Sequence, residues 1–310
     1  MQAATIGEST VAPKWRGDTP HAHDRQGQRG SKKVGILTSG FEIPPAEAAR
    51  LLHDLTAIVA RACEVIRDVS PATVVQRMKA DDSPVTAADE ASQAVILEGL
   101  ARILPGVPIV SEESAAHDHE KLGESFLIVD PLDGTREFLA GRDEFTVNLA
   151  IISGGIPIAG IIAAPKRDRL WRGIVGGKAE RLRLLKDRVD QPHPIHTRAW
   201  PRQGAVAAIS RSHFDARTDA FLESLGPIQR LPSGSAIKFC QVAEGAADLY
   251  PRFATTCEWD VAAGHALVAA AGGIVRTAQG LPLAYGRADQ GFRVPSFIAW
   301  GDPGKAAAAG

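Results

Sequence analysis

The segment that most constrains the fold spans residues 126–135 and reads FLIVDPLDGT. Its apolar, β-prone start predicts a buried strand over residues 126–130. Asp130 and Asp133 stand three residues apart where this strand is expected to end. Two carboxylates there repel each other and lose hydration, so they need a compensating cation. Hard oxygen ligands of this kind suit magnesium.

The residues after the second acid are suited to hold a phosphate. Gly134 allows the backbone to come close to a ligand, and the helix-like run after Thr135 would direct free N–H groups at it. An alternative is an Asx-type turn, in which Asp130 and Asp133 bond only to neighbouring amides. That alternative would explain an isolated D-x-x-D pattern, but three further acidic segments lie beside predicted element ends.

Each of these three segments also has a simpler explanation. The first is a Glu-Glu pair that begins at Glu112 after a short apolar run, and a solvated acidic loop remains the alternative. Asp89 completes a capping box with Thr86; capping fully explains Thr86, while the role of Asp89 stays ambiguous. Asp260 is expected to cap a helix over residues 261–271, and a capping carboxylate whose second oxygen stays free can also bind a metal.

The first half of the chain has the pattern of helices packed on a sheet. Apolar residues recur at three- and four-residue steps over 51–66 and 91–104, which predicts two amphipathic helices. Short β-rich runs follow, and the dipeptide Gly154-Gly155 predicts a tight hairpin between the last two. These runs predict a largely antiparallel sheet with strands over 107–110, 126–130, 145–153 and 156–163.

The second half has a different pattern. Charge, His-containing turns and prolines predict a linker between about residues 186 and 204. Strands and helices alternate after it, as in a smaller α/β domain. The expected strands span 205–209, 248–250 and 297–300, and the expected helices span 216–225, 236–243 and 261–271.

These patterns predict three parts of the chain. Residues 1–43 lack apolar periodicity, which predicts a disordered N-terminal tail. We expect an N-terminal α+β domain over 44–195 that carries most of the metal ligands. A C-terminal α/β domain over 196–310 is expected to supply Asp260 and the substrate contacts.

The composition excludes some classes of partner. The chain has 35 basic and 36 acidic residues and 5% aromatic residues, which gives no basic surface and little stacking for nucleic acid. Its three cysteines form no paired framework, which favours a reducing compartment. We find no membrane-spanning run and no signal peptide, and expect a cytoplasmic protein. A homodimer and peripheral membrane association stay open.

Three motifs, in this order and at these separations, resemble the signature of the inositol monophosphatase superfamily. They are Glu112-Glu113, the run Asp130-Pro131-Leu132-Asp133-Gly134-Thr135, and Trp259-Asp260. The resemblance covers roughly residues 45 to 300. It implies an α+β, α/β fold, a layered αβαβα sandwich of the inositol monophosphatase/fructose-1,6-bisphosphatase type, with the active site between the domains.

The resemblance also implies roles for individual residues. It assigns one magnesium ion to Glu112, Asp130 and the carbonyl of Leu132, a second to Asp130, Asp133 and Asp260, and a third, weaker ion to a site that shares Glu112. Asp89 and Thr135 match the catalytic pair that orients or deprotonates the attacking water, and Glu112 is counted with them as a catalytic residue. The amides of Gly134 and Thr135 match the phosphate cradle. Phosphoryl transfer needs mainly positioning and charge neutralisation, so no covalent nucleophile is required.

Finer features resemble the 3′(2′),5′-bisphosphate nucleotidase branch of this superfamily. They are Arg136-Glu137-Phe138 and the segments over 210–213, 233–240 and 243–253. By this likeness Ser210, His213, Gly234 and Lys238 match positions that contact the nucleotide. A solvated helix position for Lys238 and a capping or core role for His213 stay open as alternatives. Residues 254–257 depart from the branch, which leaves contacts from that loop in doubt.

The branch implies hydrolysis of adenosine 3′,5′-bisphosphate, and also of 3′-phosphoadenylyl sulfate, with a place in sulfur assimilation and inhibition by lithium. Inositol monophosphate or another sugar or polyol phosphate is the alternative substrate within the same fold. A catalytically silent phosphate- or nucleotide-binding protein is the alternative from another class. Competent oxygen donors at every expected ligand position argue against the silent protein.

Overall fold

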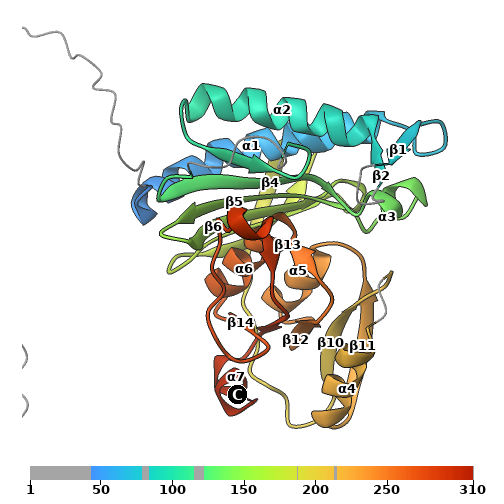
Figure 1. Ribbon diagram of the computed structural model, residues 1–310, viewed down its shortest axis with the longest axis vertical. Helices are drawn as coiled ribbons and strands as arrows, with labels where there is room; N and C mark the ends of the chain where they lie inside the picture. Colours follow the sequence, from blue (N-terminus) through green and yellow to red (C-terminus); the bar gives the residue numbers. More distant parts are fainter. Residues whose placement is uncertain (1–42, 79–83, 115–121, 187, 213–214, 310) are drawn as a thin grey trace, which may run out of the picture. The chain divides into compact units, whose positions relative to one another are not determined.

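A computed structural model describes residues 43–78, 84–114, 122–186, 188–212 and 215–309 (Figure 1). The helices are α1 Pro45–Asp68, α2 Ala87–Ile103, α3 Thr135–Leu139, α4 Ala216–Ser224, α5 Ile237–Ala243, α6 Glu258–Ala270 and α7 Pro303–Ala309. The strands are β1 Gln76–Met78, β2 Pro84–Thr86, β3 Ile109–Ser111, β4 Ser125–Asp133, β5 Thr146–Ser153, β6 Ile156–Ala164, β7 Arg169–Ile174, β8 Ala179–Leu184, β9 Val189–Pro194, β10 Ala205–Ser210, β11 Ile228–Ser233, β12 Leu249–Arg252, β13 Thr256–Cys257, β14 Ile274–Thr277, β15 Arg293–Val294 and β16 Phe297–Trp300.

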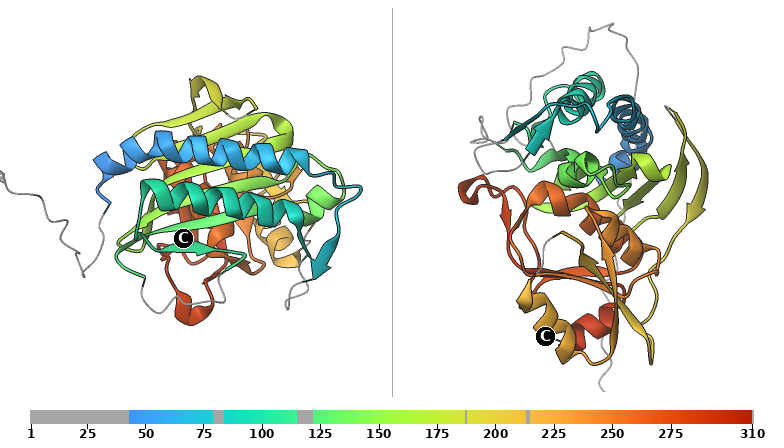
Figure 2. Two further views of the ribbon diagram at one scale, coloured as in Figure 1. Left: turned by 90° about the horizontal axis from the view of Figure 1, so that it is seen from above. Right: turned by 90° about the vertical axis from the view of Figure 1, so that its right-hand side faces the viewer.

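A seven-stranded sheet lies next to the first two long helices. Its order is β3-β4-β5-β6-β7-β8-β9, with β3 parallel to β4 and the other neighbours antiparallel. α1 and α2 lie side by side over one face, as Figure 2 shows, and α6 packs on the other. This is the predicted arrangement of helices on a largely antiparallel sheet.

The two long helices form where the sequence predicts them. α1 buries one apolar stripe, which includes Leu55, Val59 and Ile66. α2 begins at the predicted capping box, in which the Asp89 carboxylate accepts the N–H of Thr86 at 2.8 Å. The apolar faces of both helices pack on β4, β5 and β6 and form one core.

A second, five-stranded sheet is built from the C-terminal part of the chain. Its order is β11-β10-β12-β16-β14, and β10 runs parallel to both β11 and β12. α5 and α6 fill the space between the two sheets, and α4 and α7 pack on the outer face of the second one. The layers are therefore helix, sheet, helix, sheet, helix, which confirms the predicted αβαβα sandwich.

The predicted linker over residues 186–204 is wrong in its first part. β9 occupies Val189–Pro194 and pairs with β8 at the edge of the first sheet. Edge strands tolerate proline because their outer N–H positions need no partner, so Pro192 and Pro194 hid this strand in the sequence. The chain leaves the sheet after residue 194, close to the predicted domain boundary at 195, and the division into two domains stays a prediction.

Other differences concern the ends of the chain and single strands. The predicted tail lies outside the described residues except for Ile43, which is buried and donates its N–H to Ser125 Oγ. Besides β9, the sequence did not predict the short strands β1, β2, β13 and β15 or the longer strands β7, β8, β11 and β14. None of the helices in the described ranges has the length and apolar character needed to cross a membrane.

Candidate active site

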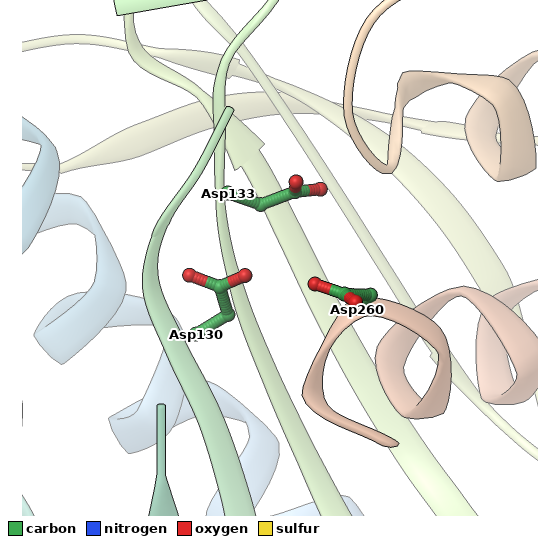
Figure 3. Close-up of side chains that lie close together, drawn as sticks. All are labelled: Asp130, Asp133 and Asp260. Atoms are coloured by element: carbon green, nitrogen blue, oxygen red, sulfur yellow. The ribbon is translucent and has the colours of Figure 1, made fainter. Parts of the chain in front are cut away.

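Three aspartates from distant parts of the sequence meet between the sheet layers. Asp130 and Asp133 belong to β4, and Asp260 lies in the first turn of α6. Each offers a carboxylate oxygen within 4.8 Å of the other two, and Figure 3 shows the side chains pointing toward one another. The three residues line a cavity of about 250 Å³. The structure thus brings together three of the predicted metal ligands.

A bulge in β4 places both of its aspartates on one face of the sheet. The strand was expected to end at Asp130, but it continues to Asp133. Side chains alternate along a regular strand, so residues three apart would point to opposite faces. Asp130 pairs with Asn148 and Asp133 pairs with Thr146, so two residues of β4 oppose one of β5. The extra residue turns Asp133 to the side of Asp130.

Asp260 differs in detail from its predicted position. It was expected to be the N-cap of its helix, but Cys257 is the N-cap and Asp260 is the third helical residue. One carboxylate oxygen, Oδ2, accepts the N–H of Cys257 at 2.8 Å and the hydroxyl of Thr256. This capping box fixes the side chain, and Asp260 still offers a carboxylate oxygen within 4.8 Å of one from each of Asp130 and Asp133.

The electrostatics of the cluster disfavour three negative charges. Burial raises the pKa of Asp130 well above its ordinary value, and the neighbouring carboxylates, Glu112 first, raise it further. Burial and the charge of Asp260 raise the pKa of Asp133 to about 7, although Lys238 lowers it. Without a cation, the folded site therefore favours protonation of Asp130 and Asp133.

The residues of the cluster fit a hard divalent cation. Asp130 Oδ2 is buried, and no hydrogen-bond donor within the described residues reaches it. Leaving a buried carboxylate oxygen without a donor is costly. A cation between the three carboxylates would satisfy this oxygen and offset the repulsion that raises the pKa values of Asp130 and Asp133. Carboxylate oxygens are the ligands that magnesium and manganese prefer.

Glu112 and Leu132 also lie on the cavity wall. Glu112 follows β3 directly, and its N–H bonds to the carbonyl of Val129 at 3.2 Å. Because β3 and β4 are parallel neighbours and Ser111 pairs with Val129, Glu112 comes next to Asp130 of β4. The predicted ligand set for a first metal therefore shares one cavity with Asp133 and Asp260. The role of Glu112, Asp130 and the Leu132 carbonyl in binding a metal stays a prediction.

The predicted catalytic pair is in hydrogen-bond contact. Thr135 Oγ1 donates to Asp89 Oδ1 at 3.0 Å, while Asp89 Oδ2 accepts both the N–H and the hydroxyl of Thr86. Asp89 is 1% exposed. The Asp89 carboxylate therefore caps α2 and also accepts the hydroxyl of Thr135, which lines the cavity. The catalytic role of the pair stays a prediction.

The predicted substrate-contact residues in the described ranges line the same cavity as the aspartates. Gly134 and Thr135 form the end next to β4, and Ser210, Gly234 and Lys238 line the part contributed by the C-terminal segments. His213 lies outside the described residues. None of these residues is tested as a substrate contact by the structure alone, and their roles stay predictions.

Lys238 is not the solvated helix residue of the alternative interpretation, because it is only 2% exposed. Its ammonium donates to the carbonyls of Ser235 at 2.6 Å and Ser233 at 3.3 Å, and lies 5.2 Å from the centre of the Tyr250 ring. Burial lowers its pKa to about 8, against the attraction of Asp133. Lys238 therefore holds its own loop as well as facing the cavity.

Arg252 was not predicted as a site residue. It ends β12 beside the end of β10, lines the cavity, and has a buried Nε without a hydrogen-bond partner in the described ranges. Ligands of α/β sheets often bind beyond the carboxyl ends of parallel strands. The basic residue at the end of the predicted strand 248–250 was the available signal, but only the pairing of β10 with β12 places it at the site.

Comparisons with known proteins agree with this geometry. The family model for the inositol monophosphatase family matches residues 49–300. The 3′(2′),5′-bisphosphate nucleotidase CysQ of Escherichia coli (strain K12) is 43% identical over 221 residues, which cover 70% of this chain and 87% of that protein.

Solved structures give the same result. CysQ from Bacteroides thetaiotaomicron, described as a bacterial member of the inositol monophosphatase family, matches with a TM-score of 0.69 at 33% identity, covering 81% of this chain and 97% of that one. An inositol monophosphatase from Zymomonas mobilis matches with a TM-score of 0.66 at 28% identity, covering 84% and 97%. The predicted fold class and the predicted likeness to the bisphosphate nucleotidase branch are confirmed. The chain belongs to the inositol monophosphatase family.

Proposed function

We propose that this protein is a magnesium-dependent 3′(2′),5′-bisphosphate nucleotidase. Its reaction is hydrolysis of adenosine 3′,5′-bisphosphate to AMP and inorganic phosphate, and 3′-phosphoadenylyl sulfate is the related second substrate. The meeting of Asp130, Asp133 and Asp260 in one cavity is the observation that carries the phosphatase activity. The 43% identity to the nucleotidase CysQ supports the choice of substrate.

The resemblance to the inositol monophosphatase superfamily supplies the proposed assignment of the metal ligands, and the meeting of Asp130, Asp133 and Asp260 supports it. Glu112, Asp130 and the Leu132 carbonyl would hold one magnesium ion, and Asp130, Asp133 and Asp260 would hold a second. A third ion would share Glu112. Bound magnesium supplies positive charge that stabilises the phosphoryl group in the transition state.

Residues of the chain itself orient the attacking water and bind the substrate. Asp89 accepts the Thr135 hydroxyl at 3.0 Å, which orients this group for contact with the attacking water. The amides of Gly134 and Thr135 bind the oxygens of the phosphate that is hydrolysed. The buried Nε of Arg252 and the ammonium of Lys238 favour a second negative charge on the substrate, as a bisphosphate carries.

A panel of substrates tests this proposal. Released phosphate is measured with adenosine 3′,5′-bisphosphate, 3′-phosphoadenylyl sulfate and inositol 1-phosphate, each with magnesium and with a chelator. We expect magnesium-dependent release, fastest from the adenosine bisphosphate, and inhibition by lithium. Much faster release from inositol 1-phosphate would overturn the substrate, and release that is unaffected by the chelator would overturn the metal dependence.

Two further properties belong to the proposal. We place the enzyme in the cytoplasm, where its small-molecule substrate would arise. The proposed oligomeric state is a homodimer, which light scattering tests. We also keep the division at residue 195 into an N-terminal domain with most metal ligands and a C-terminal domain with Asp260.

A further inference from the structure

Two buried carboxylates next to the cavity are not part of the metal cluster. Glu137 and Glu144 are each 6% exposed. Glu144 accepts two hydrogen bonds from Arg211, at 2.6 and 2.8 Å, and the N–H of Gly234 at 3.0 Å. Glu137 accepts the hydroxyl of Ser212. Both carboxylates therefore bind segments that are distant in sequence and follow β10 or β11.

Close backbone contacts join the same parts of the chain next to these carboxylates. Ser235 Oγ lies 2.8 Å from the carbonyl oxygens of both Asp133 and Glu144. A Cβ on Gly134, whose φ is +90°, would lie 2.2 Å from Ser235 Oγ, and a Cβ on Gly234 would lie 2.7 Å from the Glu144 carbonyl oxygen. The contact thus has no room for a side chain at either glycine.

These contacts join opposite walls of the cavity. We call the lining from the end of β4, with Asp133 and Gly134, the first wall, and the lining from the ends of β10 and β11, with Ser210, Ser212 and Gly234, the second wall. The Glu144 carboxylate, its two hydrogen bonds from Arg211 and the Glu137–Ser212 hydrogen bond, together called the clasp below, hold the second wall against the first. Arg211 lowers the pKa of Glu144, so this carboxylate is charged at neutral pH.

A buried carboxylate at this position needs several partners to be stable. Arg167 provides a further one, with Nη2 at 3.2 Å from Glu144 Oε1. The fork of Arg211 fixes both distance and direction, because its two parallel N–H groups meet both carboxylate oxygens. A single N–H donor does not reproduce that geometry.

We infer that the clasp is a positioning device for the organic part of the substrate: it sets the distance between the metal ligands and the wall that contacts the nucleoside. This inference rests on the proposed function for the identity of the substrate. Arg211 and Glu144 are not among the residues that line the cavity, and no residue of the clasp belongs to the aspartate cluster. Loss of the clasp is therefore expected to weaken substrate binding while the phosphate end of the site stays intact.

Arg211→Gln and Arg211→Lys test the inference. AMP formed from adenosine 3′,5′-bisphosphate is measured by chromatography to give KM and kcat, and inorganic phosphate is used as a competitive inhibitor to report on the phosphate end. We expect Arg211→Gln to raise KM about tenfold, with kcat and the inhibition constant of phosphate changed less than about twofold. Arg211→Lys should recover part of the loss, since it keeps the charge and loses the fork.

Arg181→Gln is a matched control. Arg181 pairs with Glu244 at 3.3 Å, away from the cavity, and its side chain is 39% exposed against 41% for Arg211. KM should not change in this variant. The double variant Glu144→Gln/Arg211→Gln should have a KM close to that of Arg211→Gln alone, because the two residues act as a unit.

Several outcomes would overturn the inference. They are an unchanged KM in Arg211→Gln, a kcat or phosphate inhibition constant that worsens as much as KM, and a tenfold KM change in the Arg181 control. If Arg211→Gln does not fold, Ser212→Ala removes the other contact of the clasp with a small side-chain change and should raise KM in the same selective way. If the unaltered enzyme prefers inositol 1-phosphate, the proposed function fails. The same comparison of KM, kcat and the inhibition constant of phosphate, made with that ester, then tests whether the clasp positions the substrate.

Discussion

Asp130 lies in surroundings that disfavour its charge unless a cation is bound. It is 1% exposed, and its Oδ2 lacks a hydrogen-bond donor within the described residues. Asp130→Asn removes that charge at almost constant volume. We expect the metal-free variant to unfold at the same temperature as the wild type or a few degrees higher, and its turnover to fall by at least about a hundredfold. Thermal unfolding and phosphate release check both, and persistent activity would contradict the assignment of Asp130.

Thr135 joins the metal-ligating segment to the buried Asp89 through one hydrogen bond of 3.0 Å. Thr135→Val keeps the shape of the side chain and removes the hydroxyl. We expect kcat to fall by about a hundredfold or more, while the free energy of unfolding changes by less than about 1.5 kcal/mol. Thr135→Ser should restore most of the activity. Equal activities of the valine and serine variants would show that the hydroxyl has no part in the reaction.

At the residue scale, the sequence predicts chemistry better than contacts. Asp130 and Asp133 were identified because two carboxylates at the end of a buried strand need a cation, whereas Asp260 was assigned to the metal by the resemblance to the superfamily signature. Arg252 was not identified, because its place at the cavity depends on the pairing of β10 with β12. The burial of Lys238 was equally hidden, since a lysine on a short helix is usually solvated.

At the scale of secondary-structure elements, the packing of α6 on the first sheet positions Asp260. Gly160 of β6 lies directly under this helix, and a Cβ there would lie 2.4 Å from the carbonyl oxygen of Ala263. Gly160→Ala should therefore push the start of α6 away from β4. We expect a loss of about 1–3 kcal/mol in the free energy of unfolding and a loss of turnover of tenfold or more.

Gly173→Ala provides the control for this displacement. Gly173 pairs with Gly160 across the strands, but its Cβ would meet Ala270, at the far end of α6 from Asp260. We expect a comparable loss of stability with a smaller loss of turnover. The account of α6 is wrong if Gly160→Ala keeps full activity, or if both variants lose activity equally.

The elements also show why part of the fold was predictable. α1 and α2 follow from apolar periodicity and a capping box, both of which are local signals. β9 was taken for a linker because Pro192 and Pro194 are read as breaks, yet an edge strand accepts them. The bulge in β4 has no local signal, since the continuation of pairing past Asp130 is set by β5.

For the molecule as a whole, the cluster links stability to pH and metal. Burial and Asp260 raise the pKa of Asp133 to about 7, above the roughly 4 expected in the unfolded chain. The folded state then binds protons more tightly, so this stabilisation is complete below about pH 4 and is lost as the pH rises through about 7. His265 acts in the opposite sense, because burial lowers its pKa to about 4.

A comparison with Asp133→Asn isolates the contribution of the cluster, since His265 is present in both proteins. We expect the unfolding temperature of the metal-free variant to exceed that of the metal-free wild type by a few degrees at pH 8, and this gap to shrink toward pH 4. Magnesium should raise the unfolding temperature of the wild type at pH 8 more than that of the variant. A gap that does not depend on pH would contradict the raised pKa of Asp133.

The central claim is that acids from distant segments hold divalent cations in one cavity. Crystals of the protein grown with manganese in place of magnesium test it, because manganese is located by its anomalous scattering. The account predicts at least one peak whose distances to oxygens of Asp130, Asp133 and Asp260 are roughly 2.0–2.6 Å. Bound manganese elsewhere, with no peak among these three carboxylates, would contradict it.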